Sequence, residues 1–407
     1  MNDLKQVYGL AIASRALTIC LSICTYVICG SYDSSAELVL PAESPWSFLN
    51  VFIRWDAIYF IHIARHGYVY EQEAAFFPVL PYLTHILCIS VFKPLQSILG
   101  EQYTHVLVGA LISNVSFVVA AIFLYKLTLA LYPSQPHLAK CSAFAFCLSL
   151  PSMFMSAFYT ESLFAALSFM GMYAAVSQHY LAAALIWAIA SATRSNAIVY
   201  VGFFVYFLVL RKQSSSWARL FGVIRSVIYS GITMSGFLLV QYTMYQEHCQ
   251  DHPRPWCHDR LPLAYTFIQK EYWNNGFMAY YEFKQIPNFL LAMPIIGLSV
   301  FGIYQYASQD WRSWLTLGLA TKDNRSPFYY LWAFLLVYAT TCMHVQVILR
   351  FFTSLPPLYW YIGHLWAVGL SANHSPRRQR VAKGLLLYMI LYSLIGTILF
   401  ACFLPPA

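Results

Sequence analysis

The chain has 407 residues, and only 10% of them are charged, whereas soluble domains carry about 25%. Apolar residues make up 59% of the sequence, and the mean hydropathy is +0.57. So few charged side chains cannot cover the surface of a soluble fold of this size, and so apolar a chain is not disordered. The composition therefore indicates a polytopic membrane protein.

Runs without acidic or basic residues follow one another along the whole sequence. A helix needs about 20 apolar residues to cross a hydrocarbon core of roughly 30 Å, whereas β-barrel strands are about ten residues long and alternate strictly. We therefore expect an all-α, single integral-membrane domain over residues 1–407, with nine to twelve transmembrane helices. The runs cover 16–36, 74–92, 102–125, 141–160, 162–193, 226–246, 285–309, 326–349, 351–376 and 384–407, with a shorter one at 195–210.

The distribution of charge predicts which loops face which side of the membrane. Short loops at 211–225, 310–325 and 377–383 are basic, and such loops stay in the cytoplasm. With eleven spans and a cytoplasmic N-terminus, the two long loops, 33–76 and 247–284, become luminal. The overall charge of +8 mostly reflects this sidedness, and it does not indicate binding to nucleic acid.

The cysteines at 249 and 257 share the second long loop, and a disulfide between them is possible if that loop faces an oxidising lumen. Whether they pair stays open at this stage. The sequence contains neither paired zinc-binding cysteines nor another metal-ligand cluster, so we expect no cofactor and no metal site, while a requirement for a divalent cation stays open.

In the first long loop, apolar residues recur at helical spacing and predict an amphipathic helix at the membrane surface. Asp56 follows Trp55 on this helix. A carboxylate at the lipid–water boundary suits a general base, because desolvation raises its affinity for a proton. An acid on the helix surface or at its N-cap explains Asp56 equally well. The apolar positions are Phe48, Val51, Phe52, Trp55, Tyr59 and Ile63.

Two further pairs of residues in this loop have ionisable side chains that could bind a ligand. Glu71 and Glu73 bind a metal or a sugar hydroxyl, or are simply solvated, and their spacing alone favours solvation. His62 and His66 share one helical face, as a metal pair would, but no third ligand is spaced to match. Sugar contacts or a packed pair are therefore favoured over a metal site.

Short motifs in a shared order resemble the GPI mannosyltransferase 2 family over roughly residues 45 to 365. The chain departs from the family pattern at Asn275 and matches it only loosely over 249–258. The matching segments are Arg54-Trp55-Asp56-Ala57, His66-Gly67-Tyr68, Ala75-Phe76-Phe77-Pro78, Tyr159-Thr160-Glu161, Arg194-Ser195-Asn196, Tyr272-Trp273, Gln285-Ile286-Pro287-Asn288, His344-Val345-Gln346 and Arg350-Phe351-Phe352.

This resemblance implies a GT-C-like glycosyltransferase of the endoplasmic reticulum membrane with a luminal active site. The implied donor is dolichol-phosphate mannose, and the implied acceptor is mannosyl-glucosaminyl-(acyl)phosphatidylinositol. The new linkage would be α-1,6 and would add the second mannose of the glycosylphosphatidylinositol (GPI) precursor, with inversion at the anomeric carbon. Membrane lipids surround such an enzyme, and fungal members suggest a small accessory membrane subunit.

Within this framework we expect Asp56 to be the catalytic base. Arg350 and Arg194 are each flanked by long apolar runs, which marks them as functional candidates for binding phosphate, although interfacial anchoring by snorkelling is the alternative. Gln346 lies one helical turn before Arg350. The full set of expected substrate contacts is Arg54, Trp55, His66, Glu71, Glu73, Arg194, Asn196, Trp273, Asn288, His344, Gln346 and Arg350.

Glu161 does not fit this scheme, because counting spans along the chain places it on the cytoplasmic side. The closest rival function is another dolichol-phosphate-mannose-dependent mannosyltransferase, acting on the N-glycan precursor or on a different GPI mannose. A secondary transporter is less favoured, because the chain shows no paired halves. A non-catalytic subunit of a GPI-synthesis complex is a third alternative.

Overall fold

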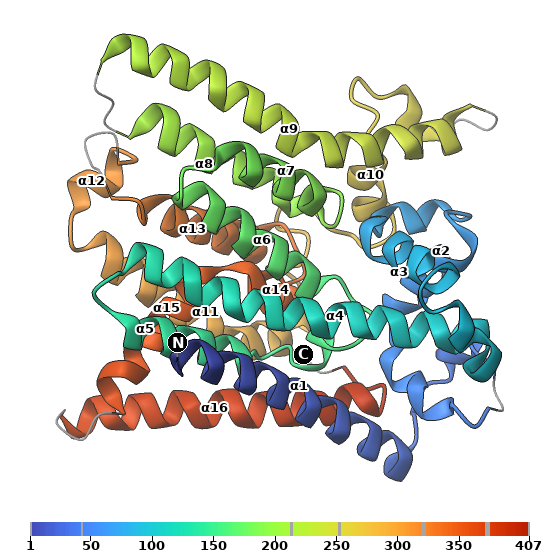
Figure 1. Cartoon of the computed structure of the whole chain (residues 1–407). Coiled ribbons are helices and arrows are strands. Elements are labelled where there is room, and N and C mark those ends of the chain that lie inside the picture. Colours follow the sequence, from blue (N-terminus) through green and yellow to red (C-terminus); the bar gives the residue numbers. More distant parts are fainter. Residues whose placement is uncertain are drawn as a thin grey trace.

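The computed structural model describes residues 2–41, 44–211, 215–250, 254–318, 323–370 and 375–405. These residues form α-helices joined by short 3₁₀ and π turns, and they contain no strand (Figure 1). The predicted all-α class is confirmed.

Among the described residues, five helices are long and apolar enough to cross a membrane: α1 (Asn2–Cys29), α4 (Gln96–Leu131), α9 (Ser216–Cys249), α11 (Ile286–Ala307) and α16 (Pro376–Ala401). This is fewer than the nine to twelve expected from charge-free runs. Shorter apolar helices pack between the long ones and share the largest buried core with them. These are α5 (Pro136–Cys147), α6 (Glu161–Val176), α7 (Tyr180–Ser191), α8 (Val201–Val205), α13 (Ser326–Thr341) and α15 (Pro356–Gly369).

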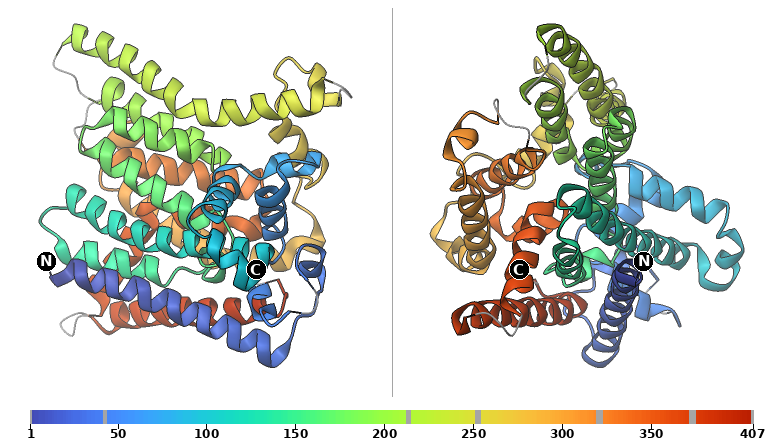
Figure 2. Two further views of the ribbon diagram at one scale, coloured as in Figure 1. Left: turned by 45° about the vertical axis from the view of Figure 1, so that its right-hand side comes forward. Right: turned by 60° about the vertical axis from the view of Figure 1, so that its left-hand side comes forward.

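The two long loops lie at the same end of the helix stack, which we call the loop end. Helices α2 (Ala57–His66), α3 (Val79–Ile89) and α10 (Ala264–Glu271) gather there (Figures 1 and 2). The short helix α12 (Trp311–Leu315), which belongs to one of the basic loops, lies at the opposite end (Figure 1). Acidic and basic loops are thus separated along the helix axes, as the charge pattern predicts.

The predicted order of spans was wrong in two places. Run 74–92 contains only α3, whose 11 residues measure roughly 16 Å, so it stays at the loop end beside α2 and α4. Run 162–193 instead folds as two packed helices, α6 and α7. The chain therefore does not cross the helix stack at α3, and it crosses twice through α6 and α7, so the segment between these two places lies at the end opposite to the one expected. Glu161, expected on the cytoplasmic side, therefore begins α6 at the loop end (Figure 1).

The predicted surface helix of the first loop is broken into two pieces. A 3₁₀ helix covers Ser47–Phe52, and α2 begins only at Ala57. The break contains Trp55, whose backbone φ of +43° is rare for a residue with a side chain. Most of the apolar side chains in this segment are buried against α4 and the 153–159 segment instead of facing lipid.

Candidate active site

Four charged side chains from distant parts of the chain meet at the loop end. Arg350, in the short helix α14 (Ile348–Phe351), donates from Nε to Oε1 of Glu161 at 2.7 Å. It also donates from Nη2 to Oδ2 of Asp56 at 2.9 Å. Nη1 of Arg194, which follows α7, lies 3.1 Å from the same Glu161 oxygen. Two carboxylates and two guanidinium groups thus alternate in one balanced cluster.

Local structure explains how each member of the charged cluster is presented. Asp56 occupies the N-cap position of α2 but makes no capping hydrogen bond with its side chain, so its carboxylate is available to Arg350. Glu161 is the first residue of α6, and Arg194 lies in extended backbone just before the next 3₁₀ turn. Three helix termini therefore converge on α14.

The charged cluster is largely shielded from solvent. The Glu161 side chain is 0% exposed, Arg350 is 19% exposed and Asp56 is 30% exposed. The Arg350 guanidinium lies 4.5 Å from the ring centroid of Phe154 and 5.0 Å from that of Tyr159. Charges in such surroundings interact strongly, because little water screens them. Asp56 is the acid of the cluster that remains partly accessible.

Asp56 and both arginines line a polar pocket of about 310 Å³. Predicted site residues from both loops and from the late helices come together here, namely Asp56, Arg194, Asn196, Trp273, His344, Gln346 and Arg350. Sequence reasoning did not single out Thr160, Ser195, Tyr265 and Gln269, which complete much of its polar wall together with Asn275. Such a lining of amides, hydroxyls and aromatic rings suits a sugar.

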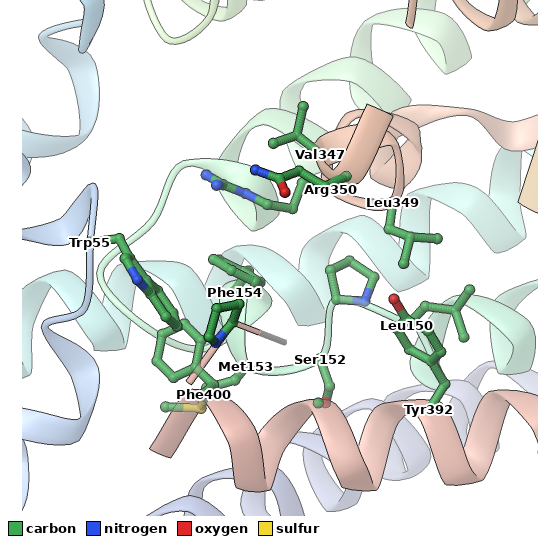
Figure 3. A pocket seen from close by; sticks show the side chains of 14 residues that line it. Trp55, Leu150, Ser152, Met153, Phe154, Val347, Leu349, Arg350, Tyr392 and Phe400 are labelled. Atoms are coloured by element: carbon green, nitrogen blue, oxygen red, sulfur yellow. The ribbon is translucent and has the colours of Figure 1, made fainter. Parts of the chain in front are cut away.

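A second pocket, of about 270 Å³, shares Arg350, Gln346 and Val347 with the polar pocket (Figure 3). Its other walls are mostly apolar and come chiefly from Trp55, the 150–154 segment, α14 and α16. They include Trp55, Leu150, Pro151, Met153, Phe154, Leu349, Tyr392, Gly396 and Phe400. We call this the apolar pocket.

Trp55 and Asp56 are neighbours in the sequence, but Trp55 lines the apolar pocket and Asp56 lines the polar pocket. The Trp55 ring packs on Phe400 and Phe403 with centroids 5.2 and 5.1 Å apart, while Asp56 lines the polar pocket. The positive φ of Trp55 accompanies this split. Backbone strain of this kind concentrates at functional sites, where the surrounding packing holds it in place.

Two predicted site residues support the polar pocket in different ways. His344 stacks on Tyr280 with ring centroids 4.4 Å apart and lines the pocket. Asn288 is absent from the described pocket lining and donates to the Tyr280 hydroxyl at 2.8 Å. Asn288 therefore lies behind the pocket wall and orients Tyr280.

Glu71 joins the two long loops instead of being solvated. Its carboxylate accepts hydrogen bonds from Arg254 at 2.7 and 2.8 Å, from Trp256 at 3.0 Å and from the Tyr272 hydroxyl at 2.9 Å. Burial alone would raise the pKa of Glu71, but these donors outweigh it and lower the pKa. The Cys249–Cys257 disulfide, left open by the sequence, is formed beside this contact.

Glu73, His66 and Arg54 are held by contacts outside the polar pocket. Buried Glu73 accepts from the backbone N–H groups of Val69 and Tyr70 at 2.8 and 2.9 Å, and it lies 2.5 Å from His62. His66 packs beside His62, as the packed-pair alternative predicts. Arg54 is 1% exposed and donates to the carbonyl of Ala401 at 3.0 Å. None of these three residues belongs to the described lining of the polar pocket.

Glu161 is the site residue that sequence reasoning placed wrongly. Its signal was present, because it is the only acid between Lys140 and Arg194, and an acid within apolar spans is functional by default. The described residues contain no group of three or more side chains suited to a metal. Arg194 and Arg350 carry the positive charge in the polar pocket.

Comparison with known proteins places this site in a family. Residues 4–407 match the family described as Mannosyltransferase (PIG-V). The chain is 32% identical to GPI alpha-1,6-mannosyltransferase 2 of Mus musculus over 98% of each chain. It is 32% identical to the Homo sapiens protein of that name, over 89% of this chain and 84% of the other. GPI mannosyltransferase 2 of Gibberella zeae is 31% identical over 92% and 91%. The chain, a multi-pass membrane glycosyltransferase, belongs to the PIG-V mannosyltransferase family.

Proposed function

We propose that this protein adds the second mannose of the GPI precursor, transferring it from dolichol-phosphate mannose to the first mannose in an α-1,6 linkage. Membership of the family supports mannosyl transfer, and the names of the mouse and human relatives support the linkage and the acceptor class. The observation that carries the proposal is a partly accessible carboxylate, Asp56, beside a buried guanidinium in a polar pocket.

In the proposed reaction, the acceptor hydroxyl attacks the anomeric carbon of the donor in a single displacement. Asp56 removes the hydroxyl proton as the new carbon–oxygen bond forms, and the bond from the anomeric carbon to the phosphate oxygen breaks. The configuration at that carbon inverts. One carboxylate suffices because phosphate is a good leaving group, in contrast to the paired carboxylates of glycoside hydrolases.

Arg350 is suited to stabilise the negative charge that develops on the leaving phosphate. A guanidinium binds phosphate oxygens through two parallel N–H groups and stays charged in a poorly hydrated site. Arg350 bridges Asp56 and Glu161 in the described structure, so it already faces the position of the base. Arg194 lines the same pocket and adds a second positive charge. Glu161 holds both guanidinium groups in place.

Three observations support a luminal site in the endoplasmic reticulum. Both long loops contribute to the polar pocket, and the second contains the Cys249–Cys257 disulfide. Disulfides persist in oxidising compartments and are rare in the cytosol. The basic loops are distributed as expected for the cytoplasmic side. A site at the membrane surface also suits two substrates that are both anchored in lipid.

The identity of the acceptor is tested by the GPI lipid that accumulates when the protein is depleted from cells. The proposal predicts a precursor with a single mannose, restored to normal by the intact chain. Purified protein should then convert this lipid with labelled donor, and an α-1,6-specific mannosidase should release the label. Accumulation of an N-glycan precursor, or of a GPI lipid with a different number of mannoses, would reject the proposal in favour of the rival transferase.

A further inference from the structure

The apolar pocket has no role in the reaction described so far. Trp55, Phe154 and Phe400 form one side of it, and Leu150, Leu349 and Tyr392 form the other (Figure 3). Its lining on α16 belongs to a helix that is long and apolar enough to span the membrane. The pocket thus joins a membrane helix to the charged cluster.

Arg350 stands at the boundary between the two pockets and lines both of them. Its guanidinium therefore has sugar-binding amides and hydroxyls on one side and hydrocarbon side chains on the other. A ligand that matches this order has a polar ring, then an anionic group, then an apolar chain. Charge complementarity at Arg350 fixes the anion at the junction.

Both proposed substrates are lipids, but only one has this order at its reacting end. In a polyprenyl-phosphate sugar, the phosphate links the reacting anomeric carbon directly to the chain. In the acceptor, glucosamine and inositol rings separate the reacting mannose from the phosphate and its acyl chains. The apolar pocket shares Arg350 with the polar pocket. It therefore lies next to the position of the donor's polyprenyl chain and far from the acyl chains of the acceptor.

We infer that the apolar pocket binds the first isoprene units of the polyprenyl donor, with its phosphate at Arg350 and its mannose in the polar pocket beside Asp56. This inference rests on the proposed function and assigns the donor a position within it. The acyl chains of the acceptor lie elsewhere on the membrane-facing surface.

Gly396 provides a way to block the apolar pocket without touching the charged cluster. It lies within α16 and lines the pocket, so we expect a large side chain at this position to reduce the space for the chain. Gly384, on the same helix, is the matched control because an added Cβ there meets no atom within 4 Å. A substitution at either site changes helix propensity equally, and only Gly396 belongs to the described lining of the pocket.

The test measures the KM for donor and the KM for acceptor separately on the purified full chain. Gly396→Leu should raise the KM for dolichol-phosphate mannose by about tenfold or more, since even one misfitting methylene in an apolar site costs that much. The KM for acceptor should stay unchanged. Inhibition by dolichyl phosphate, the released product, should weaken in parallel. Gly384→Leu should leave all three quantities at the wild-type value.

Gly396→Ala provides the graded variant in case the larger side chain prevents folding, and it should raise the donor KM less than leucine does. A rise in the acceptor KM alone would assign the pocket to the acceptor lipid. Unchanged constants in both folded variants would show that no substrate chain enters it. Either result overturns the inference but leaves the proposed function intact, whereas wild-type protein that transfers no mannose from this donor would refute the function itself.

Discussion

The buried carboxylate of Glu161 should be essential for stability as well as for activity. Glu161→Gln keeps the shape of the side chain but removes the only negative charge shown in contact with Arg194 and one of two shown beside Arg350. Glu161 is 0% exposed, so water cannot replace the lost charge. Removing one partner of a buried ion pair costs about 3–5 kcal/mol, because the other charge stays buried without compensation.

A matched control exists in the same protein. Glu101 pairs with Arg65 at 3.4 Å, but its side chain is 54% exposed. Exposed pairs contribute about 0.2–1 kcal/mol, so Glu101→Gln should be nearly neutral. Unfolding of both variants by denaturant in the same detergent gives the free energies, and mannose transfer by the folded fraction gives the activity.

The comparison decides whether the charged cluster is organised as described. Glu161→Gln should be less stable than Glu101→Gln by at least about 2 kcal/mol, as the ranges for buried and exposed pairs imply, and its folded fraction should transfer mannose poorly. Equal stabilities would show that Glu161 does not neutralise the two arginines. Full activity in the folded fraction would show that their position does not matter for the reaction.

Three further predictions concern other contacts. Arg350→Lys keeps the charge but cannot contact Asp56 and Glu161 in the same way, so kcat should fall by about 10²–10³, and wild-type kcat would refute the phosphate role. Glu71 has a lowered pKa in the folded protein, so its stabilisation is present above the unfolded pKa of about 4.3 and is lost as the pH falls through the folded pKa. The difference in melting temperature between wild type and Glu71→Gln should therefore be positive at neutral pH and vanish in acid, and a difference that does not change with pH would contradict the assignment. Cys249 and Cys257 should react with maleimide only after reduction, as mass spectrometry of the labelled peptides will show, and labelling of unreduced protein would exclude the disulfide.

Composition and the length of the charge-free runs were sufficient to predict an all-α membrane protein. So few charged residues leave no soluble alternative, and runs of about 20 residues fit membrane helices and not barrel strands. The number and order of spans were harder to predict. Run 74–92 has the composition of a span, yet α3 ends at Ile89 after 11 residues and packs on α2 and α4. Hydropathy cannot distinguish a short helix buried by other helices from one that crosses lipid, because both are apolar.

The site residues differ in how clearly the sequence marks them. Arg350 and Arg194 stood out because they are flanked by long apolar runs, and Asp56 stood out as an acid at the expected membrane surface within a motif of the family. The structure brings all three together. Glu161 carried the same signal, but the wrong count of spans moved it to the other side. Glu71 and Glu73 looked solvated because their partners are distant in sequence or lie in the backbone, as the contact from Arg254 to Glu71 illustrates. Such pairings depend on tertiary structure that local spacing does not reveal.

The role of Asp56 as the catalytic base is tested most directly by the rate at which Asp56→Asn transfers mannose from labelled dolichol-phosphate mannose to the one-mannose GPI lipid. Asparagine preserves the size of the side chain but cannot accept the proton, so kcat should fall by about 10²–10⁴ while the protein remains folded. Asp33→Asn, an exposed acid in the same loop, should transfer at the wild-type rate. Transfer by folded Asp56→Asn at the wild-type rate would contradict the claim that this carboxylate is the base.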